Sequence, residues 1–403
     1  MEMTLEKLFK FDLVNRLEES LVREKSPERL FKFVGTYQQI QSVDQFVNES
    51  PSYPGSTDKI VRSEMVSAIG ATLAIEGTLL REEEIEESFR KAGLNEKLRR
   101  KEREAENSRK VYEFIIGLVR EIKEDFAYSE PLIKQLHSYF TQGLNYLGNT
   151  PGQYRGDFPA TFGYPRRTGL CKTQADIEKG MSLLISWLNK TDSGILSSNI
   201  IAKGIMAHYY LTEIHPFGDG NGRVARALEA LVLYINGVNS YCFWSLANFW
   251  SMHRDEYISH LGNIRNTCDP WDFIIWGMEG YLNEVIRIKE LVLKKVKQLM
   301  LLDYSRYLVE IGYEADPKSQ RRVKISRRLF DVVQLLVRSG KMPLEKFLSS
   351  PEIKAMYKAV SPATKSRDFK RMAETGLVRI TQETQGNFIE PNYQILERLT
   401  YNV

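Results

Sequence analysis

Apolar residues recur at three- and four-residue spacings along most of the chain, which is the repeat of one face of an α-helix. A helix is expected from Asp58, where Ile60, Met65, Ile69 and Leu73 share a face. Further helices are predicted over residues 111–118, 131–140, 177–188, 200–214, 224–235 and 271–300. The pattern therefore predicts a mostly α fold.

The segment from Arg81 to Glu106 differs, because charged residues of both signs replace the apolar face. Glutamates and basic residues recur there at helical spacing, so the segment is expected to form solvated helix surface. We assign no function to it. Two histidines on helices, His137 and His208, are expected to pack against neighbours rather than to bind a ligand.

Residues 318–403 have a pattern of their own. It predicts a helix over 322–337 and two further helices whose starts are marked by Ser-Pro pairs. Two β-type segments then flank Gln385-Gly386, which is the signal of a β-hairpin. Three helices and a hairpin, with a basic third helix, look like a winged helix-turn-helix domain.

Between two predicted helices lies the stretch His-Pro-Phe-Gly-Asp-Gly-Asn-Gly-Arg-Val-Ala-Arg, residues 215–226. Its glycines let a ligand approach the backbone N–H groups, which, with the helix start that follows, form an anion-binding site. Arg223 and Arg226 share the first turn of that helix, where the dipole disfavours cations unless an anion is bound. The stretch therefore predicts a phosphate cradle, to which His215 adds a base and Asp219 a metal ligand.

This stretch resembles the signature of Fic-domain proteins, His-x-Phe-x-(Asp/Glu)-Gly-Asn-Gly-Arg-x-x-Arg, and meets every fixed position. The resemblance covers roughly residues 60–290 and implies a Fic-type helical core with a small β-hairpin flap. It also implies a protein adenylyltransferase, a nucleotidyltransferase that moves AMP from ATP to a hydroxyl group of a target protein.

The resemblance implies a role for each residue of the site. His215 would be the general base, although it also ends a helix, a position that favours its protonated form. Asp219 would hold one Mg²⁺ ion. Tyr257 would line the adenine pocket, because its segment resembles the family's Asn-Arg-x-x-Tyr-Tyr-x-x-Leu helix. The remaining nucleotide-binding residues would be Gly220, Asn221, Gly222, Arg223, Val224, Ala225 and Arg226.

A second motif lies upstream, where Thr72-Leu73-Ala74-Ile75-Glu76-Gly77 ends a predicted helix. From position alone, Glu76 is a carboxylate near a helix C-terminus, where the macrodipole disfavours it and a cationic partner is expected. The segment resembles the Fic inhibitory motif (Ser/Thr)-x-x-x-Glu-(Gly/Asn), which implies that Glu76 pairs with Arg226 and keeps it from the γ-phosphate of ATP. The enzyme would then be autoinhibited; an ordinary solvated glutamate is the alternative.

The pair Tyr154-Arg155 precedes a loop in which Fic proteins place the hairpin flap that pairs with the target's backbone. Here the loop is residues 156–165, which lack the family's Val-x-Ile alternation. Pro159 cannot donate a hydrogen bond to a strand ladder. A hairpin is expected at this place, and a plain structural loop is the alternative.

Composition and charge add the setting. The chain is 42% hydrophobic and 27% charged, and its three cysteines fit no disulfide or zinc pattern. We expect a cytoplasmic protein with neither a signal peptide nor a membrane span. The net charge of +4 hides an asymmetry, because residues 318–371 hold fifteen Lys and Arg against four Asp and Glu. This segment therefore has a charge of +11 and the rest of the chain −7, which suggests that the C-terminal domain, residues 318–403, binds duplex DNA, with protein docking or dimerisation as the alternative.

The sequence therefore predicts an N-terminal helical region at 1–110 that carries the inhibitory helix, a Fic catalytic core at 111–300 and a winged helix-turn-helix-like domain at 318–403. The target would offer a Ser, Thr or Tyr hydroxyl, and the chain itself is one candidate; a homodimer is left open. Two other functions stay open. The same site could remove AMP from a target, or transfer another nucleotide, or the chain could be a DNA-binding regulator whose Fic core senses nucleotide.

Overall fold

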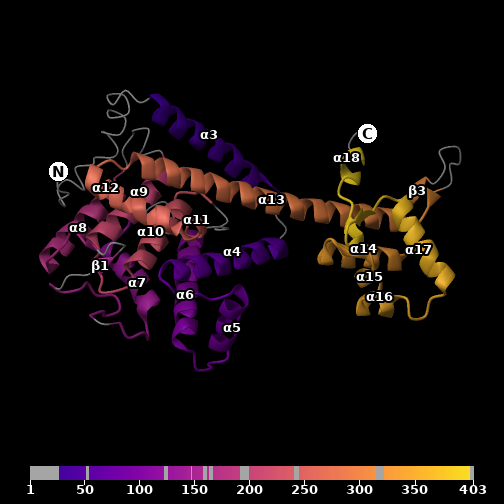
Figure 1. Ribbon diagram of the computed structural model, residues 1–403, viewed down its shortest axis with the longest axis horizontal. Coiled ribbons are helices and arrows are strands. Elements are labelled where there is room, and N and C mark those ends of the chain that lie inside the picture. The colour runs from indigo at the N-terminus through magenta and orange to yellow at the C-terminus, as the bar shows by residue number, and fades with distance from the viewer. Residues whose placement is uncertain are drawn as a thin grey trace. The chain divides into compact units, whose positions relative to one another are not determined.

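The computed structural model describes residues 27–50, 54–121, 126–146, 148–157, 161–162, 167–190, 199–239, 245–314 and 322–399 (Figure 1). These residues are mainly helical and add short strands in small antiparallel sheets, which confirms the mostly α fold. Residues 1–26, part of the predicted N-terminal region, lie outside the described ranges. No helix in these ranges is long and apolar enough to cross a membrane.

The chain divides into two compact units, Met1–Lys289 and Glu290–Val403. The division falls inside one long helix, α13 (Trp271–Glu310), which continues past residue 300, where sequence reasoning had ended the core. The N-terminal helical region and the predicted core up to Lys289 lie together in the first unit, whereas residues 290–300 of the predicted core belong to the second. The other helices of the first unit are α3 (Pro27–Glu49), α4 (Pro54–Ile75), α5 (Glu82–Gly93), α6 (Arg100–Glu121), α7 (Glu130–Thr141), α8 (Gln174–Leu188), α9 (Ile200–Ile214), α10 (Asn221–Ile235), α11 (Ala247–Met252) and α12 (Arg254–Thr267).

Helices α9 and α10 form the centre of the first unit, and nearly all of their residues are buried. Buried polar side chains within this centre are paired with one another. Nδ1 of His208 lies 2.7 Å from Oε2 of Glu229, and the same carboxylate oxygen accepts from Nε1 of Trp250 at 3.1 Å. His208 therefore packs inside the core, as expected. The connection between α9 and α10 is held at both ends by these buried helices.

Helix α4 packs against α5, α6, α10 and α11. Its apolar face, which includes Ile69 and Leu73, meets Ile85 of α5 and Tyr112 of α6 in one cluster. The helix begins at Pro54, before the expected start at Asp58, because proline suits the first helical position. It ends at Ile75, directly before Glu76. Nε of Arg254 donates to the carbonyl oxygen of Ile75 at 3.1 Å and so caps the helix end.

The charged segment from Arg81 to Glu106 was wrongly predicted to be wholly solvated. Three glutamates of α6 are buried, with Glu102 3%, Glu104 5% and Glu106 3% exposed. The reason is that α6 packs against α4, α5 and α7, so its polar face is covered too. Their charges are matched by ion pairs to Lys91, Arg99, Arg100 and Arg109, which is how carboxylates can be buried.

The predicted hairpin at the flap position is present. Strand β1 (Thr161–Phe162) pairs antiparallel with β2 (Arg167–Thr168), in the register Thr161 to Thr168 and Phe162 to Arg167. The ladder begins after Pro159, which is compatible with the missing N–H of proline. Residues 158–160 and 163–166 lie outside the described ranges.

The second unit contains the predicted hairpin and helices around a core of its own. The helix predicted over 322–337 begins instead at Arg327, because Ser326 caps it and Arg322–Val323 form a short strand. One sheet of this unit has three strands, β5 (Met342–Pro343), β6 (Val378–Glu383) and β7 (Gly386–Pro391), in the order β5-β7-β6. Strands β6 and β7 form the predicted hairpin, and the short strand β5 pairs with β7. The core of this unit holds Leu329, Val333, Phe347, Ile353, Met372, Leu377 and Ile389. Its elements after α13 are β3 (Tyr313–Glu314), β4 (Arg322–Val323), α14 (Arg327–Ser339), β5 (Met342–Pro343), α15 (Leu344–Leu348), α16 (Pro351–Met356), α17 (Pro362–Glu374), β6 (Val378–Glu383), β7 (Gly386–Pro391) and α18 (Ile395–Leu399). The winged-helix interpretation itself stays a prediction.

Candidate active site

Residues 215–226 form the loop between α9 and α10 and the first turn of α10. His215 and Gly220 have left-handed backbone, with φ of 52° and 80°, so the chain turns after α9 and again into α10. Asn221 closes the loop: its Oδ1 accepts from the N–H of Phe217 at 2.9 Å and its Nδ2 donates to the Phe217 carbonyl at 2.8 Å. The side chain of Asn221 therefore shapes the loop, and only its backbone N–H is left to face a ligand.

His215 is 8% exposed and is oriented as a proton acceptor. Its Nδ1 lies 3.1 Å from the carbonyl oxygen of Thr212, so Nδ1 carries the proton and Nε2 is the basic nitrogen. Burial lowers the pKa of His215 to about 4, against the opposite effect of the Thr212 carbonyl. The ring is thus neutral at pH 7. The helix-end effect, expected to favour the protonated form, is outweighed by burial.

The backbone around His215 is fixed from the flap side. Nε of the buried Arg155 donates to the His215 carbonyl oxygen at 2.9 Å, and the same guanidinium donates to the carbonyl of Cys171. A Cβ atom on Gly169, next to the hairpin, would stand 2.8 Å from Cβ of His215, closer than side chains pack. Glycine at this position lets the hairpin end directly beside the base.

Asp219 and Arg223 form an ion pair at the start of α10. Nη2 of Arg223 donates to Oδ1 of Asp219, and the two side chains are 5% and 39% exposed for Arg223 and Asp219 respectively. No cluster of three or more metal-ligating side chains occurs in the described ranges. A single accessible carboxylate is nevertheless what Mg²⁺ uses when phosphate oxygens and water complete its shell. Asp219 therefore fits a magnesium ion that arrives with a nucleotide.

The first turn of α10 offers backbone donors. The N–H groups of the first helical residues have no partner within the helix, and the ladder begins where the Val224 N–H donates to the Gly220 carbonyl at 3.0 Å. Val224 and Ala225 are fully buried. These two predicted nucleotide-binding residues pack in the core, so their side chains are not brought to the site.

Arg226 is 1% exposed and is held by Thr72 and Glu76, at the C-terminal end of α4 and just after it. Its Nε donates to Oγ1 of Thr72 at 2.8 Å, and its Nη2 donates to the Thr72 carbonyl at 3.2 Å and to Oε1 of Glu76 at 2.6 Å. The ion pair implied by the resemblance is thus formed, and Glu76 is not an ordinary solvated glutamate. The side chain of Glu76 keeps 40% of its surface exposed.

The carboxylate of Glu76 lies directly over the helix start. A Cβ atom on Gly222 would stand 2.4 Å from Oε1 of Glu76, so the glycine is what admits the carboxylate. Partial burial tends to raise the pKa of Glu76, but the charges of Arg226 and Arg223 outweigh it and lower the pKa. Glu76 is therefore ionised at neutral pH and occupies the position of an anion between two arginines.

Tyr257 lies beside Arg226 but is 4% exposed. Its hydroxyl is 2.7 Å from Nε2 of His208 and its ring packs against Trp250. The structure therefore places Tyr257 on the buried side of Arg226, where its hydroxyl forms a hydrogen bond with His208.

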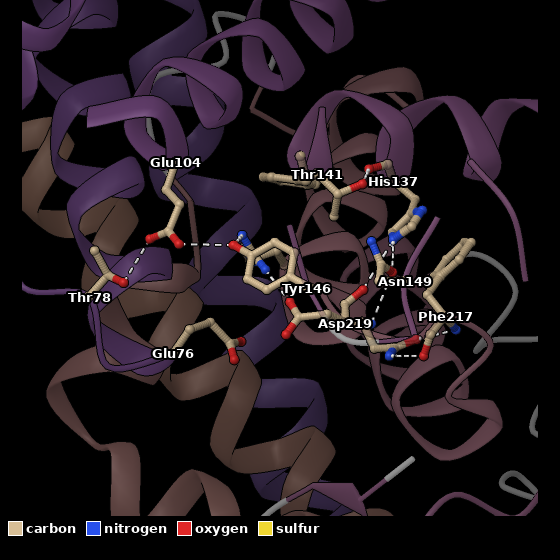
Figure 2. A network of polar contacts seen from close by, with 12 residues as sticks. Glu76, Thr78, Glu104, His137, Thr141, Tyr146, Asn149, Phe217 and Asp219 are labelled. Atoms are coloured by element: carbon tan, nitrogen blue, oxygen red, sulfur yellow. Dashed lines mark hydrogen bonds and ion pairs between the residues drawn. The ribbon is translucent and has the colours of Figure 1, made fainter. Parts of the chain in front are cut away.

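Sequence reasoning missed residues that hold the loop from α7 and the turn after it (Figure 2). The ring of His137 stacks on Phe217, with centroids 3.8 Å apart. Its Nδ1 accepts from the Gly152 N–H at 3.0 Å, so Nε2–H points to Oδ1 of Asn149 and the carbonyl of Asp219, each at 3.1 Å. His137 packs, as predicted, but it also fixes Asp219. The only sequence signal was the turn Gly148-Asn149-Thr150-Pro151.

Residues 127–233 match the family model described as the Fic/DOC family. The chain is 43% identical over 54 residues to the protein adenylyltransferase fic-1 of Caenorhabditis elegans, a segment that is 13% of this chain and 10% of that relative. The chain thus matches about a tenth of the length of this curated relative.

Two solved structures share the fold. A Fic family protein from Desulfovibrio desulfuricans G20 superposes with a TM-score of 0.54 at 15% identity, over 89% of this chain and 95% of that one. Fic-1 from Caenorhabditis elegans superposes with a TM-score of 0.51 at 19% identity, over 69% of this chain and 77% of that one. At these identities the likeness shows the fold.

Proposed function

Because residues 127–233 form a Fic domain, we propose that this chain is a protein adenylyltransferase that moves AMP from ATP to a hydroxyl group of a target protein. The observation that carries the proposal is the loop itself. It joins a neutral buried base, an accessible carboxylate and two buried arginines at one helix start. Such a site can hold phosphates and accept a proton, which are the two tasks of the reaction.

In the proposed reaction, the oxygen of a target Ser, Thr or Tyr attacks the α-phosphorus of ATP. The new O–P bond forms as the bond from the α-phosphorus to the bridging oxygen breaks, and pyrophosphate leaves with that electron pair. Nε2 of His215 accepts the proton of the attacking hydroxyl. The hairpin β1–β2 ends beside His215, so a target segment lying along it would bring its hydroxyl to the base.

The phosphates of ATP would be held by this chain's own donors. The guanidinium of Arg223 and the N–H groups at the start of α10 neutralise the α- and β-phosphates, and Arg226 forks onto the γ-phosphate. A Mg²⁺ ion held by Asp219 would supply charge neutralisation on the phosphate oxygens. Asp219 would then exchange its ion pair with Arg223 for the metal.

The pair Glu76–Arg226 supports autoinhibition. Glu76 takes the guanidinium that the γ-phosphate needs, and it is ionised at neutral pH. ATP can bind in the productive orientation only when this carboxylate leaves. The chain is therefore proposed to be a default-off enzyme.

The proposal is tested by asking which phosphate of ATP, the α-phosphate or the γ-phosphate, becomes attached to the protein. We expect ATP labelled in the α-phosphate to label this chain covalently in the presence of Mg²⁺, and mass spectrometry to locate AMP on a Ser, Thr or Tyr. ATP labelled in the γ-phosphate serves as the control and should leave the chain unlabelled. Labelling by γ-labelled ATP alone, or no AMP adduct even after Glu76 is replaced, would overturn the proposal.

A second activity is proposed for the second unit, binding of duplex DNA. The exposed face of α17 presents Arg367 and Lys370, and the segment 318–371 carries the charge excess described above. A basic helix that meets phosphates releases counterions, so its affinity falls steeply as salt rises.

We expect the full chain to slow the migration of duplex DNA in a gel at low salt. A plot of the logarithm of the binding constant against the logarithm of the salt concentration should fall linearly, with a slope of roughly −0.9 for each phosphate contacted. Replacing both Arg367 and Lys370 with alanine should weaken binding and reduce that slope by about two. The matched control removes two exposed lysines of the same unit, Lys354 and Lys358. Equal effects of both pairs, or no retardation of DNA at low salt, would count against a binding role for α17.

A further inference from the structure

Arg223 is fixed by a residue outside the signature. Its Nη1 donates to the hydroxyl oxygen of Tyr146 at 3.3 Å, and its guanidinium carbon stands 5.3 Å from the centre of the Tyr146 ring. Tyr146 comes from the loop after α7 and is partly buried. The buried guanidinium is thus held by Tyr146 on one side and by Asp219 on the other, while its Nε–H has no hydrogen-bond partner among the residues that the structure describes.

The hydroxyl of Tyr146 is itself oriented. It donates to Oε1 of Glu104 at 2.9 Å (Figure 2). The lone pairs of the hydroxyl oxygen are then left to accept from Arg223. Glu104 lies on α6, is 5% exposed and belongs to the charged segment for which the sequence suggested no function. A hydrogen bond to a carboxylate held in an ion pair, as Glu104 is with Arg100, is stronger than one to a neutral acceptor.

The other oxygen of Glu104 is held by the inhibitory segment, residues 72–78, which comprises the motif that ends at Gly77 and the adjoining Thr78. Oγ1 of Thr78, two residues after Glu76, donates to Oε2 of Glu104 at 2.8 Å. The Thr78 backbone N–H in turn donates to the Leu73 carbonyl at 2.9 Å, which ties Thr78 to the end of α4. Figure 2 shows these side chains as one chain of contacts from Thr78 through Glu104 to Tyr146.

We propose that Glu104 and Tyr146 are positioning residues: the carboxylate of Glu104 aims the Tyr146 hydroxyl, which sets the guanidinium of Arg223 for the phosphates of ATP. The inference rests on the proposed function, which assigns Arg223 to those phosphates. It makes the inhibitory segment act on both arginines of the signature. Glu76 reaches Arg226 directly, and Thr78 reaches Arg223 through Glu104 and Tyr146.

The experiment measures the dissociation constant of ATP by calorimetry in the full chain carrying Glu76→Gly. Tyr146→Phe keeps the ring over Arg223 and removes only the hydroxyl. We expect it to raise the dissociation constant about tenfold, because a hydrogen bond to a charged group is lost. In a chain that also carries Arg223→Ala, Tyr146→Phe should change the dissociation constant less than about twofold, because the hydroxyl then has no guanidinium to position. Such non-additivity is the sign that two residues act through each other.

Two further variants make the test specific. Glu104→Gln keeps an acceptor of the same shape and should cost less than Tyr146→Phe. Tyr128→Phe is the matched control, because Tyr128 is a buried tyrosine whose hydroxyl contacts Asn236 at 3.3 Å, and it should leave the constant unchanged.

The outcomes separate the two levels of inference. If the Glu76→Gly chain does not bind ATP, the proposed function fails and the positioning role fails with it. If that chain binds ATP and Tyr146→Phe has no effect, only the positioning role is overturned. An equal loss with and without Arg223 would also overturn it, since Tyr146 would then act on the fold at large and not through the guanidinium.

Discussion

Replacing Glu76 with glycine is expected to raise automodification by ATP and Mg²⁺ about tenfold or more. A charge-assisted hydrogen bond of this type contributes about 1.5–3 kcal/mol, which corresponds to one to two decades in rate. Because Glu76 is 40% exposed, solvent screening places the expected gain near the lower end of that range. The rate should be followed as incorporation of α-phosphate label, with the affinity for ATP changing less than the rate.

Three variants control this result. Glu76→Gln keeps the shape of the side chain without its charge and should give a smaller gain. Arg226→Ala should be inactive, and the double variant of Glu76 and Arg226 should stay inactive, because nothing then holds the γ-phosphate. If Glu76→Gly shows no gain, the pair does not limit the reaction.

The same variant also tests the alternative activity, hydrolytic removal of AMP from a modified target. In that activity Glu76, whose side chain is 40% exposed, would orient the water molecule that displaces AMP from the target's oxygen. In that case Glu76→Gly should lose the release of AMP from an AMP-modified protein. Autoinhibition alone predicts no such loss.

Replacing His215 is expected to reduce AMP transfer by about 10²–10⁴-fold, which is the usual contribution of a general base. Two substitutions should be compared in the Glu76→Gly chain, His215→Ala and His215→Asn. Asparagine tolerates the left-handed backbone that His215 adopts at φ 52° but offers no basic nitrogen. Equal losses for both variants would separate the missing base from backbone strain.

The affinity for ATP provides the control, because His215 is not expected to hold the phosphates. Calorimetry should give nearly the same dissociation constant with and without the His215 side chain. Transfer that survives in the asparagine variant would remove His215 from the role of base.

The sequence was informative where local patterns determine the structure. The loop of residues 215–226 could be predicted because glycines and a helix start are local features. The helix that ends just before Glu76 could be predicted because apolar residues repeat along α4. The hairpin at 161–168 was expected from its place in the chain. The sequence also shows the charge of each residue, but it does not show which charged side chains are buried.

What failed depended on packing between distant segments. Glu104 lies in a run that resembles solvated surface, and its burial follows from the helices on either side of α6. The engagement of Asn221 by Phe217 and of Tyr257 by His208 could not be read from spacing. The low pKa of His215 has the same origin, because the sequence shows the helix end and not the burial that outweighs it.

The two hydrogen bonds from Arg226 to Thr72 have a consequence for how inhibition can end. They hold the guanidinium independently of Glu76, so it stays aimed at the site when the carboxylate leaves. Glu76 then behaves as a tethered competitor of the γ-phosphate, with an effective concentration on the order of millimolar or more. Because the competition is for Arg226 and not for binding of ATP as a whole, the resting output of the enzyme would be set by the fraction of bound ATP whose γ-phosphate has replaced the carboxylate, and it would level off once ATP saturates the site.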